Sequence, residues 1–124
     1  MPTATISIPP ATEHVRVARM VATAAARRGS VPEEAVDEVR LAVGEAVARV
    51  VLRHLRAGVT ADVVVSFRND PDAFEVEIAD KTSVDMGDDD DGLSVALTKA
   101  VAPQATFSPA GREQRVRLVW PLVS

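Results

Sequence analysis

The spacing of apolar residues changes along the chain, and each change marks an expected element. From Thr3 to Ile8 apolar and polar residues alternate, which is typical of a strand with one buried face. Two prolines then end the strand, because proline cannot donate a ladder hydrogen bond. From Thr12 the spacing is that of an amphipathic helix, which ends near Gly29. Its expected inward face is Val15, Ala18, Val21, Ala22 and Ala25.

A longer second helix is expected to end at Gly58. Its valines recur at steps of three and four residues, and this amphipathic pattern outweighs the weak helix propensity of valine. These valines are Val36, Val39, Val43, Val47 and Val50. The sequence from Ser30 to Glu33 predicts a capping box, in which Ser30 caps free amides and Glu33 reaches back.

The second half of the chain predicts four strands and one more helix. Residues 61–67 and 74–79 are β-branched or aromatic-rich runs separated by turn residues, which indicates a hairpin. A charged loop is expected from Asp80 to Asp91, because little there can be buried. A helix, a short strand, a turn and a last strand should follow at residues 92–101, 105–108, 109–111 and 115–121. In the last strand we expect Val116, Leu118 and Trp120 to face inward, and Arg115 and Arg117 to face outward.

The expected order is therefore β-α-α-β-β-α-β-β. Grouped helices and mainly hairpin-linked strands predict an α+β two-layer sandwich, in which three helices cover one face of a mixed, mainly antiparallel sheet. We expect residues 1–124 to form a single domain, because a chain of 124 residues with 47% hydrophobic residues can bury one sizeable core.

Charge and composition exclude several classes of protein. The formal net charge is −4, which gives no general attraction to nucleic acid or to an anionic membrane. The chain has no cysteine, and therefore no disulfide and no thiolate metal site. Its apolar runs are broken by charges well short of a bilayer span, so that a cytoplasmic location is expected.

A resemblance to a known family rests on the second helix. Residues 40–49 read Arg-Leu-Ala-Val-Gly-Glu-Ala-Val-Ala-Arg and resemble the N-box of the anti-sigma serine kinases of the RsbW/SpoIIAB type, in the GHKL (Bergerat) ATPase superfamily. The order of elements is similar over essentially the full chain. The resemblance implies a fold like the ATPase domain of histidine kinases.

In active members of this family the box has a glutamate followed four residues later by an asparagine. The two share a helix face, where the glutamate is a general base and the asparagine oxygen holds Mg²⁺. Here Glu45 matches the base, but Arg49 stands at the asparagine position. Arginine has five donors and no acceptor, and so cannot bind Mg²⁺. We expect Arg49 to pair with Glu45 across one turn; the alternative for Glu45 is an ordinary surface glutamate.

The next family box is Asp-x-Gly-x-Gly, whose aspartate receives the adenine amino group. Asp80 matches it, while Thr82 and Val84 occupy the glycine positions and should hinder close approach of a nucleotide. The alternative for Asp80 is a turn-forming residue at a strand end. A later glycine-rich box is reduced to Gly92, at the start of the third helix, where backbone amides can still attract phosphate. These departures predict that binding of ATP and Mg²⁺ is weakened or lost.

The resemblance implies an anti-sigma factor that sequesters a sigma factor and is released by an anti-anti-sigma partner with a STAS domain. It also implies a homodimer built partly on the first strand and helix. In a gapless alignment Arg19 falls on an arginine with which SpoIIAB-type proteins contact sigma factor. Arg16 lies one turn earlier, so both are candidate partner-binding residues; a solvated helix face is the alternative.

Two other functions stay open at this point. One is an active ATP-dependent protein-serine kinase that phosphorylates the anti-anti-sigma factor, with Arg49 contacting phosphate. The other is a pseudo-enzyme that binds only the antagonist.

No metal site is predicted. A calcium loop at 85–91 fails the EF-hand spacing, and His14 and His54 lack a second ligand at metal spacing.

Overall fold

The computed structural model describes residues 3–82, 92–111 and 113–122. These residues form nine secondary-structure elements. In chain order they are β1 (Thr3–Ile8), a 3₁₀ turn (Thr12–His14), α1 (Val15–Arg28), α2 (Glu33–Ala57), β2 (Val63–Asn69), β3 (Ala73–Asp80), α3 (Gly92–Val101), β4 (Gln104–Ala110) and β5 (Glu113–Pro121). The expected order of helices and strands is confirmed. Val84 and the acidic stretch considered for calcium lie outside the described residues.

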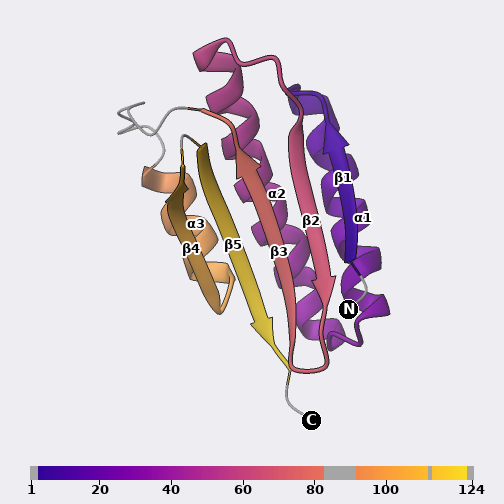
Figure 1. Ribbon diagram of the computed structural model, residues 1–124. Coiled ribbons are helices and arrows are strands. Elements are labelled where there is room, and N and C mark those ends of the chain that lie inside the picture. Colours follow the sequence, from indigo (N-terminus) through magenta and orange to yellow (C-terminus); the bar gives the residue numbers. More distant parts are fainter. Residues whose placement is uncertain (1–2, 83–91, 112, 123–124) are drawn as a thin grey trace.

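The strands form one sheet in the order β1-β2-β3-β5-β4. Every neighbouring pair is antiparallel, so the sheet is antiparallel throughout its described strands rather than mixed. The three helices lie together behind one face of this sheet, and the other face is open (Figure 1). The predicted α+β two-layer architecture is therefore confirmed.

Helix α2 lies between the other two helices (Figure 1). Its valine face belongs to the hydrophobic core. All five predicted valines are at most 2% exposed. On the sheet, Val116, Leu118 and Trp120 face this helix layer and are also at most 2% exposed, as predicted. Burying a side chain of this size contributes about 1.5–3 kcal/mol, so the packing of α2 on the sheet is a major source of stability.

The open face of the sheet carries the outward residues of β5. Arg117 pairs with Glu75 and Arg115 with Glu77, each across the β3–β5 ladder. The side chains of both arginines are about half exposed, which confirms their predicted direction. Such exposed pairs contribute little to stability but keep this face polar.

The predicted capping box between α1 and α2 is wrong. Pro32 is the N-cap of α2, and no side chain caps that end. Ser30 has a φ of 62° and closes α1: its N–H donates to the carbonyl of Arg27, and the N–H of Val31 donates to that of Ala26. These are the two hydrogen bonds of a Schellman motif. The left-handed position of this motif, here Ser30, is usually occupied by glycine.

Glu33 also departs from the capping box, because its carboxylate accepts hydrogen bonds from Arg27. Those hydrogen bonds, together with the attraction of the same carboxylate, raise the pKa of Arg27 above its ordinary value. Glu33 thus ties the first turn of α2 to the last turn of α1.

The end of the chain shows one further difference from the sequence expectations. Pro109 was expected in a turn, but it lies in β4 opposite Gln114, and Gly111 with a φ of 66° begins the turn. Proline is tolerated there because β4 is an edge strand. In α3 the apolar side chains turn largely to the surface, with Leu93 71% and Leu97 45% exposed.

The left-handed conformation of Ser30 leads to a prediction about stability. Replacing Ser30 by glycine should raise the free energy of unfolding by about 0.5–1 kcal/mol, because glycine has no Cβ to clash at positive φ. Urea denaturation followed by circular dichroism measures the change. As a control, Gly58→Ala should lower that free energy by about 1 kcal/mol, since Gly58 has a φ of 68°. A lower stability of Ser30→Gly would contradict the assignment.

Candidate functional site

Three polar residues of α2 follow one another at four-residue spacing: Glu45, Arg49 and Arg53. Each step of four residues advances about 40° around a helix, so the row turns steadily from the surface toward the core. The burial follows this turn, since Glu45 is half-buried, Arg49 is 7% exposed and Arg53 is 2% exposed. Each of the three meets a different part of the chain.

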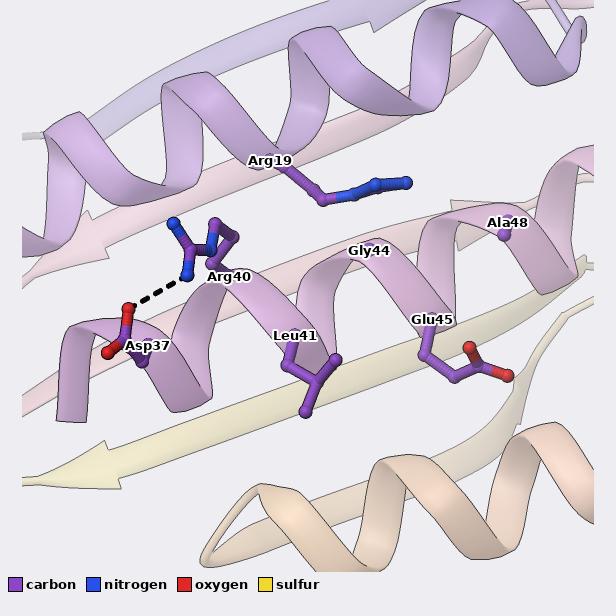
Figure 2. A pocket seen from close by; sticks show the side chains of 7 residues that line it. All are labelled: Arg19, Asp37, Arg40, Leu41, Gly44, Glu45 and Ala48. Atoms are coloured by element: carbon purple, nitrogen blue, oxygen red, sulfur yellow. Dashed lines mark hydrogen bonds and ion pairs between the residues drawn. The ribbon is translucent and has the colours of Figure 1, made fainter. Parts of the chain in front are cut away.

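Glu45 contacts the beginning of α3. Its Oε1 accepts a hydrogen bond of 2.9 Å from the hydroxyl of Ser94, two residues after Gly92. Figure 2 shows the Glu45 side chain projecting from the side of α2 that lies toward α3. The structure therefore brings the candidate general base close to the remnant of the glycine-rich box, although Gly92 itself is exposed.

Arg49 packs against the edge strand. The centre of its guanidinium lies 5.0 Å from the centroid of the Phe107 ring in β4, and the ammonium of Lys99 lies 5.8 Å from the same centroid. Two cations near one ring indicate cation–π attraction, worth about 0.5–2 kcal/mol for each depending on exposure. These contacts were not anticipated, because the sequence led us to expect a partner for Arg49 within α2.

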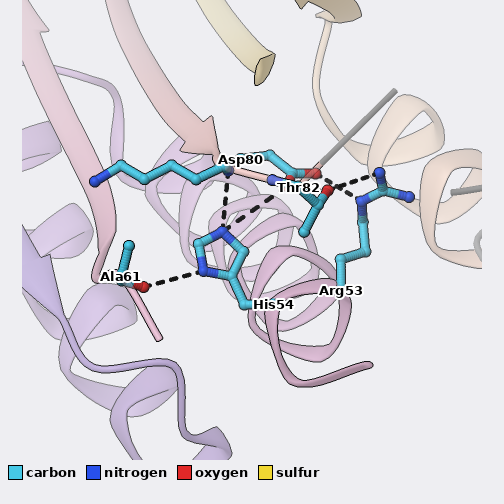
Figure 3. Close-up of polar contacts among 6 residues, drawn as sticks. Arg53, His54, Ala61, Asp80 and Thr82 are labelled. Atoms are coloured by element: carbon cyan, nitrogen blue, oxygen red, sulfur yellow. Dashed lines mark hydrogen bonds and ion pairs between the residues drawn. The ribbon is translucent and has the colours of Figure 1, made fainter. Parts of the chain in front are cut away.

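Asp80, at the end of β3, forms the most buried polar contacts of the described chain. Its Oδ2 accepts a hydrogen bond of 2.6 Å from Nε of Arg53. Its Oδ1 accepts two from Thr82, one of 2.6 Å from the hydroxyl and one of 3.0 Å from the backbone N–H. Nη2 of Arg53 donates to the same hydroxyl at 2.9 Å, which closes the network shown in Figure 3.

His54 is held by backbone groups on both sides. Its Nε2 accepts a hydrogen bond of 3.0 Å from the N–H of Lys81, so the ring proton must be on Nδ1, which donates to the carbonyl of Ala61 at 3.1 Å. The ring is fully buried, and its contacts are drawn in Figure 3. It joins the segments before β2 and after β3, and both ring nitrogens are used for that purpose.

The candidate partner residues lie elsewhere, on the exposed side of α1. Arg19 extends from α1 across Gly44 of α2 (Figure 2). A Cβ at Gly44 would lie only 2.8 Å from Nε of Arg19, so this glycine provides the space for the arginine. The groove beside it has a volume of ≈ 580 Å³ and is also lined by Glu45, Leu41 and Arg40.

A second groove continues along α1 with a volume of ≈ 380 Å³. It is lined by Arg16, Arg19, Met20, Thr23, Ala24, Arg27 and Arg40. Arg40 is neutralised by Asp37 and Arg27 by Glu33. Arg16 and Arg19 have no acidic partner among the described residues, so this surface presents unneutralised positive charge beside the exposed Met20.

The side chains do not fit the ATP and Mg²⁺ that the resemblance implies. An adenine amino group needs an accessible carboxylate oxygen, but Asp80 is fully buried, and its carboxylate accepts hydrogen bonds from Arg53 and Thr82. A metal ion needs an oxygen where Arg49 presents only donors. Among the described residues, no group of three histidines, aspartates or glutamates converges as metal ligands.

Sequence reasoning identified Glu45, Arg49 and Asp80, considered His54 only as a metal ligand, and missed Arg53, Ser94 and Phe107. A signal for Arg53 was present, because it follows Glu45 and Arg49 at the same spacing on one helix. The contact with Asp80 was not visible, since 27 residues separate the two.

Comparisons with known proteins agree with this fold. The family described as a histidine kinase-like ATPase domain matches residues 8–120. A solved structure of the RsbU and RsbW domains of Rv1364c from Mycobacterium tuberculosis is similar over 96% of this chain, with a TM-score of 0.72 and 13% sequence identity. This chain covers 31% of that one, and at such identity the likeness concerns the fold. No curated protein sequence matches significantly.

Within the described residues, no helix is both long and apolar enough to cross a membrane.

The buried histidine gives a testable expectation. His54→Leu should lower the free energy of unfolding by about 2–4 kcal/mol, because the N–H of Lys81 and the carbonyl of Ala61 both lose their partner. Urea denaturation measures the loss. The matched change His14→Leu, at a half-buried position outside this network, should cost less than about 1 kcal/mol. Equal effects of the two changes would show that the His54 hydrogen bonds are unimportant.

Proposed function

The chain belongs to the histidine kinase-like ATPase domain family, and from this premise we propose that it is an anti-sigma factor. In this proposal it sequesters an RNA polymerase sigma factor in the cytoplasm and releases it when an anti-anti-sigma protein with a STAS domain competes for the same surface. The likeness in fold to a solved structure that contains an RsbW domain supports this choice within the family.

The observation that carries the proposal is the basic surface between α1 and α2. Arg16 and Arg19 project there with no acidic partner among the described residues, and Gly44 leaves the space in which Arg19 lies. Exposed Met20 and Leu41, 64% and 60% accessible, provide apolar contacts beside the charges. An arginine with apolar neighbours in a groove is the kind of site that dominates binding energy in protein interfaces.

A homodimer is part of the same proposal. β1 is an edge strand of the sheet and α1 lies behind it, so both belong to one border of the molecule (Figure 1). An edge strand presents backbone groups that a second copy can pair with. The partner surface on α1 then lies close to the dimer interface.

We propose that this protein binds its partners with weakened or lost ATP binding. The residue types at two nucleotide positions support this, because Arg49 cannot hold Mg²⁺ and Asp80 is bonded within the chain. The groove that contains Arg19 requires neither of them.

Capture of partners from the source cell tests the proposed function. The tagged full chain should retain one sigma factor and, separately, one protein with a STAS domain, identified by mass spectrometry. Purified sigma factor should then be displaced from the chain by the purified STAS protein without added nucleotide. Recovery of neither protein would overturn the proposal.

The groove itself is tested by two changes with different effects on stability. Arg19→Ala should weaken binding of the captured sigma factor at least about 30-fold, as expected for an interface hot spot. Gly44→Ala should also weaken it, because the new Cβ displaces Arg19, while leaving the folded state as stable or up to about 1 kcal/mol more stable in the helix. Isothermal calorimetry and urea denaturation measure the two quantities.

Arg28→Ala is the matched control, since Arg28 is exposed on the same helix but lies outside both grooves. Its affinity for the sigma factor should stay within about twofold. Unchanged affinity in Arg19→Ala would place the interface elsewhere.

A further inference from the structure

Arg53 is one of the largest buried side chains among the described residues. It is 2% exposed and lies on α2 beside the end of β3 (Figure 3). Removing a guanidinium from water costs several kcal/mol unless a counter-charge and hydrogen bonds replace the solvent. The position of Arg53 therefore depends on the groups that meet it.

The carboxylate of Asp80 supplies that replacement. Nε of Arg53 lies 2.6 Å from Oδ2, and both side chains are at most 2% exposed. Thr82 completes the arrangement, because its hydroxyl donates to Oδ1 and accepts from Nη2 of Arg53. Cation, carboxylate and hydroxyl thus form a closed ring of contacts within one chain.

This arrangement conflicts with recognition of adenine by Asp80. A base can bind a carboxylate only where an oxygen is accessible, and Asp80 has no accessible surface. The side chain of Thr82 lies against Oδ1, at a position where the family pattern has a glycine. Opening the site would require breaking the ion pair and leaving a charge buried without its partner.

We infer that the Arg53 guanidinium takes the place of the adenine amino group at Asp80, which makes this aspartate an internal counter-ion and closes the cleft to adenine nucleotides. The fold then reaches its stable state without a nucleotide. For the proposed function, on which this consequence rests, release of the sigma factor proceeds by competition between proteins and needs no phosphorylation step.

The first test uses the wild-type chain with ADP and with ATP, each with and without Mg²⁺. At 1 mM nucleotide the melting temperature should change by less than about 1 °C, because a nucleotide stabilises only a protein that it binds. A saturable rise in melting temperature with ADP that disappears in Asp80→Asn would overturn the inference.

The second test measures the coupling between the two charges without any ligand. Arg53→Met and Asp80→Asn should each lower the melting temperature by about 10 °C or more, since each leaves one buried charge without its partner. The double variant should lose no more than the larger single loss. Additive losses would show that the two residues do not act as a pair and would contradict the inference.

Two further variants keep this test decisive. Arg56→Met removes an exposed arginine from the same helix and should leave the melting temperature almost unchanged. Arg53→Lys keeps the positive charge but cannot supply both the Nε and Nη2 contacts, so it should give an intermediate loss if the methionine variant fails to fold. A loss as small as that of Arg56→Met would sink the inference.

Neither test contains a partner protein, so their failure is distinct from failure of the proposed function. A chain that binds ADP at Asp80 and still captures a sigma factor would refute only the inference drawn from Arg53. A chain with the expected coupling that captures no sigma factor would refute only the proposed function.

Discussion

The packing of one helix face on the sheet fixes the rest of this molecule. Helix α2 has 25 residues, and its valines at steps of three and four must all face the strands. This requirement leaves no freedom of rotation, so every other residue of α2 has a fixed direction. Gly44 then faces α1, and Arg53 faces the end of β3.

Positive charge is exposed on the side of α2 toward α1 and buried on the side toward the end of β3. On the α1 side, Arg16 and Arg19 are exposed, and their charge is available to another molecule. Toward the end of β3, the charge of Arg53 is buried and must be neutralised inside the chain by Asp80. A buried ion pair adds little net stability over an apolar pair, but it strongly penalises any arrangement that separates its members. Together with the hydrogen bonds of His54, the next residue of the helix, it fixes where the last turns of α2 lie against β3.

Periodicity predicted most of the fold, because helix and strand spacing depends on local sequence and on which side is buried. It failed where a residue type permits two local structures. Serine is a preferred N-cap residue. Ser30 nevertheless occupies the left-handed position that ends α1, since the chain must turn there before Pro32. Likewise Pro109 is compatible with a turn and with an edge strand, and only the position of β4 at the sheet border decides.

Motif reasoning had the opposite limit at the candidate site. Spacing placed Glu45 and Arg49 correctly on one helix, but a motif describes which residues a ligand would meet and not which residues meet each other. Asp80 was therefore assigned to adenine, while its contact with Arg53 depends on how α2 crosses the end of β3. That crossing is a tertiary property, and no pattern within α2 alone contains it.

The groove that contains Arg19 and the ion pair of Arg53 with Asp80 lie at separate places along α2. This separation allows nucleotide binding to change while the groove is kept. Gly44 and Arg53 are nine residues apart on α2, or about 13.5 Å along the helix axis at 1.5 Å per residue. Arg19 is positioned by Gly44, and none of the residues that line its groove belongs to the ring formed by Arg53, Asp80 and Thr82. Glu45 lies between these regions, lining the groove while accepting a hydrogen bond from Ser94. The orientation of Glu45 depends on α2 and α3 rather than on a nucleotide. The groove therefore keeps its shape when Arg53, and not a nucleotide, contacts Asp80 at the end of β3.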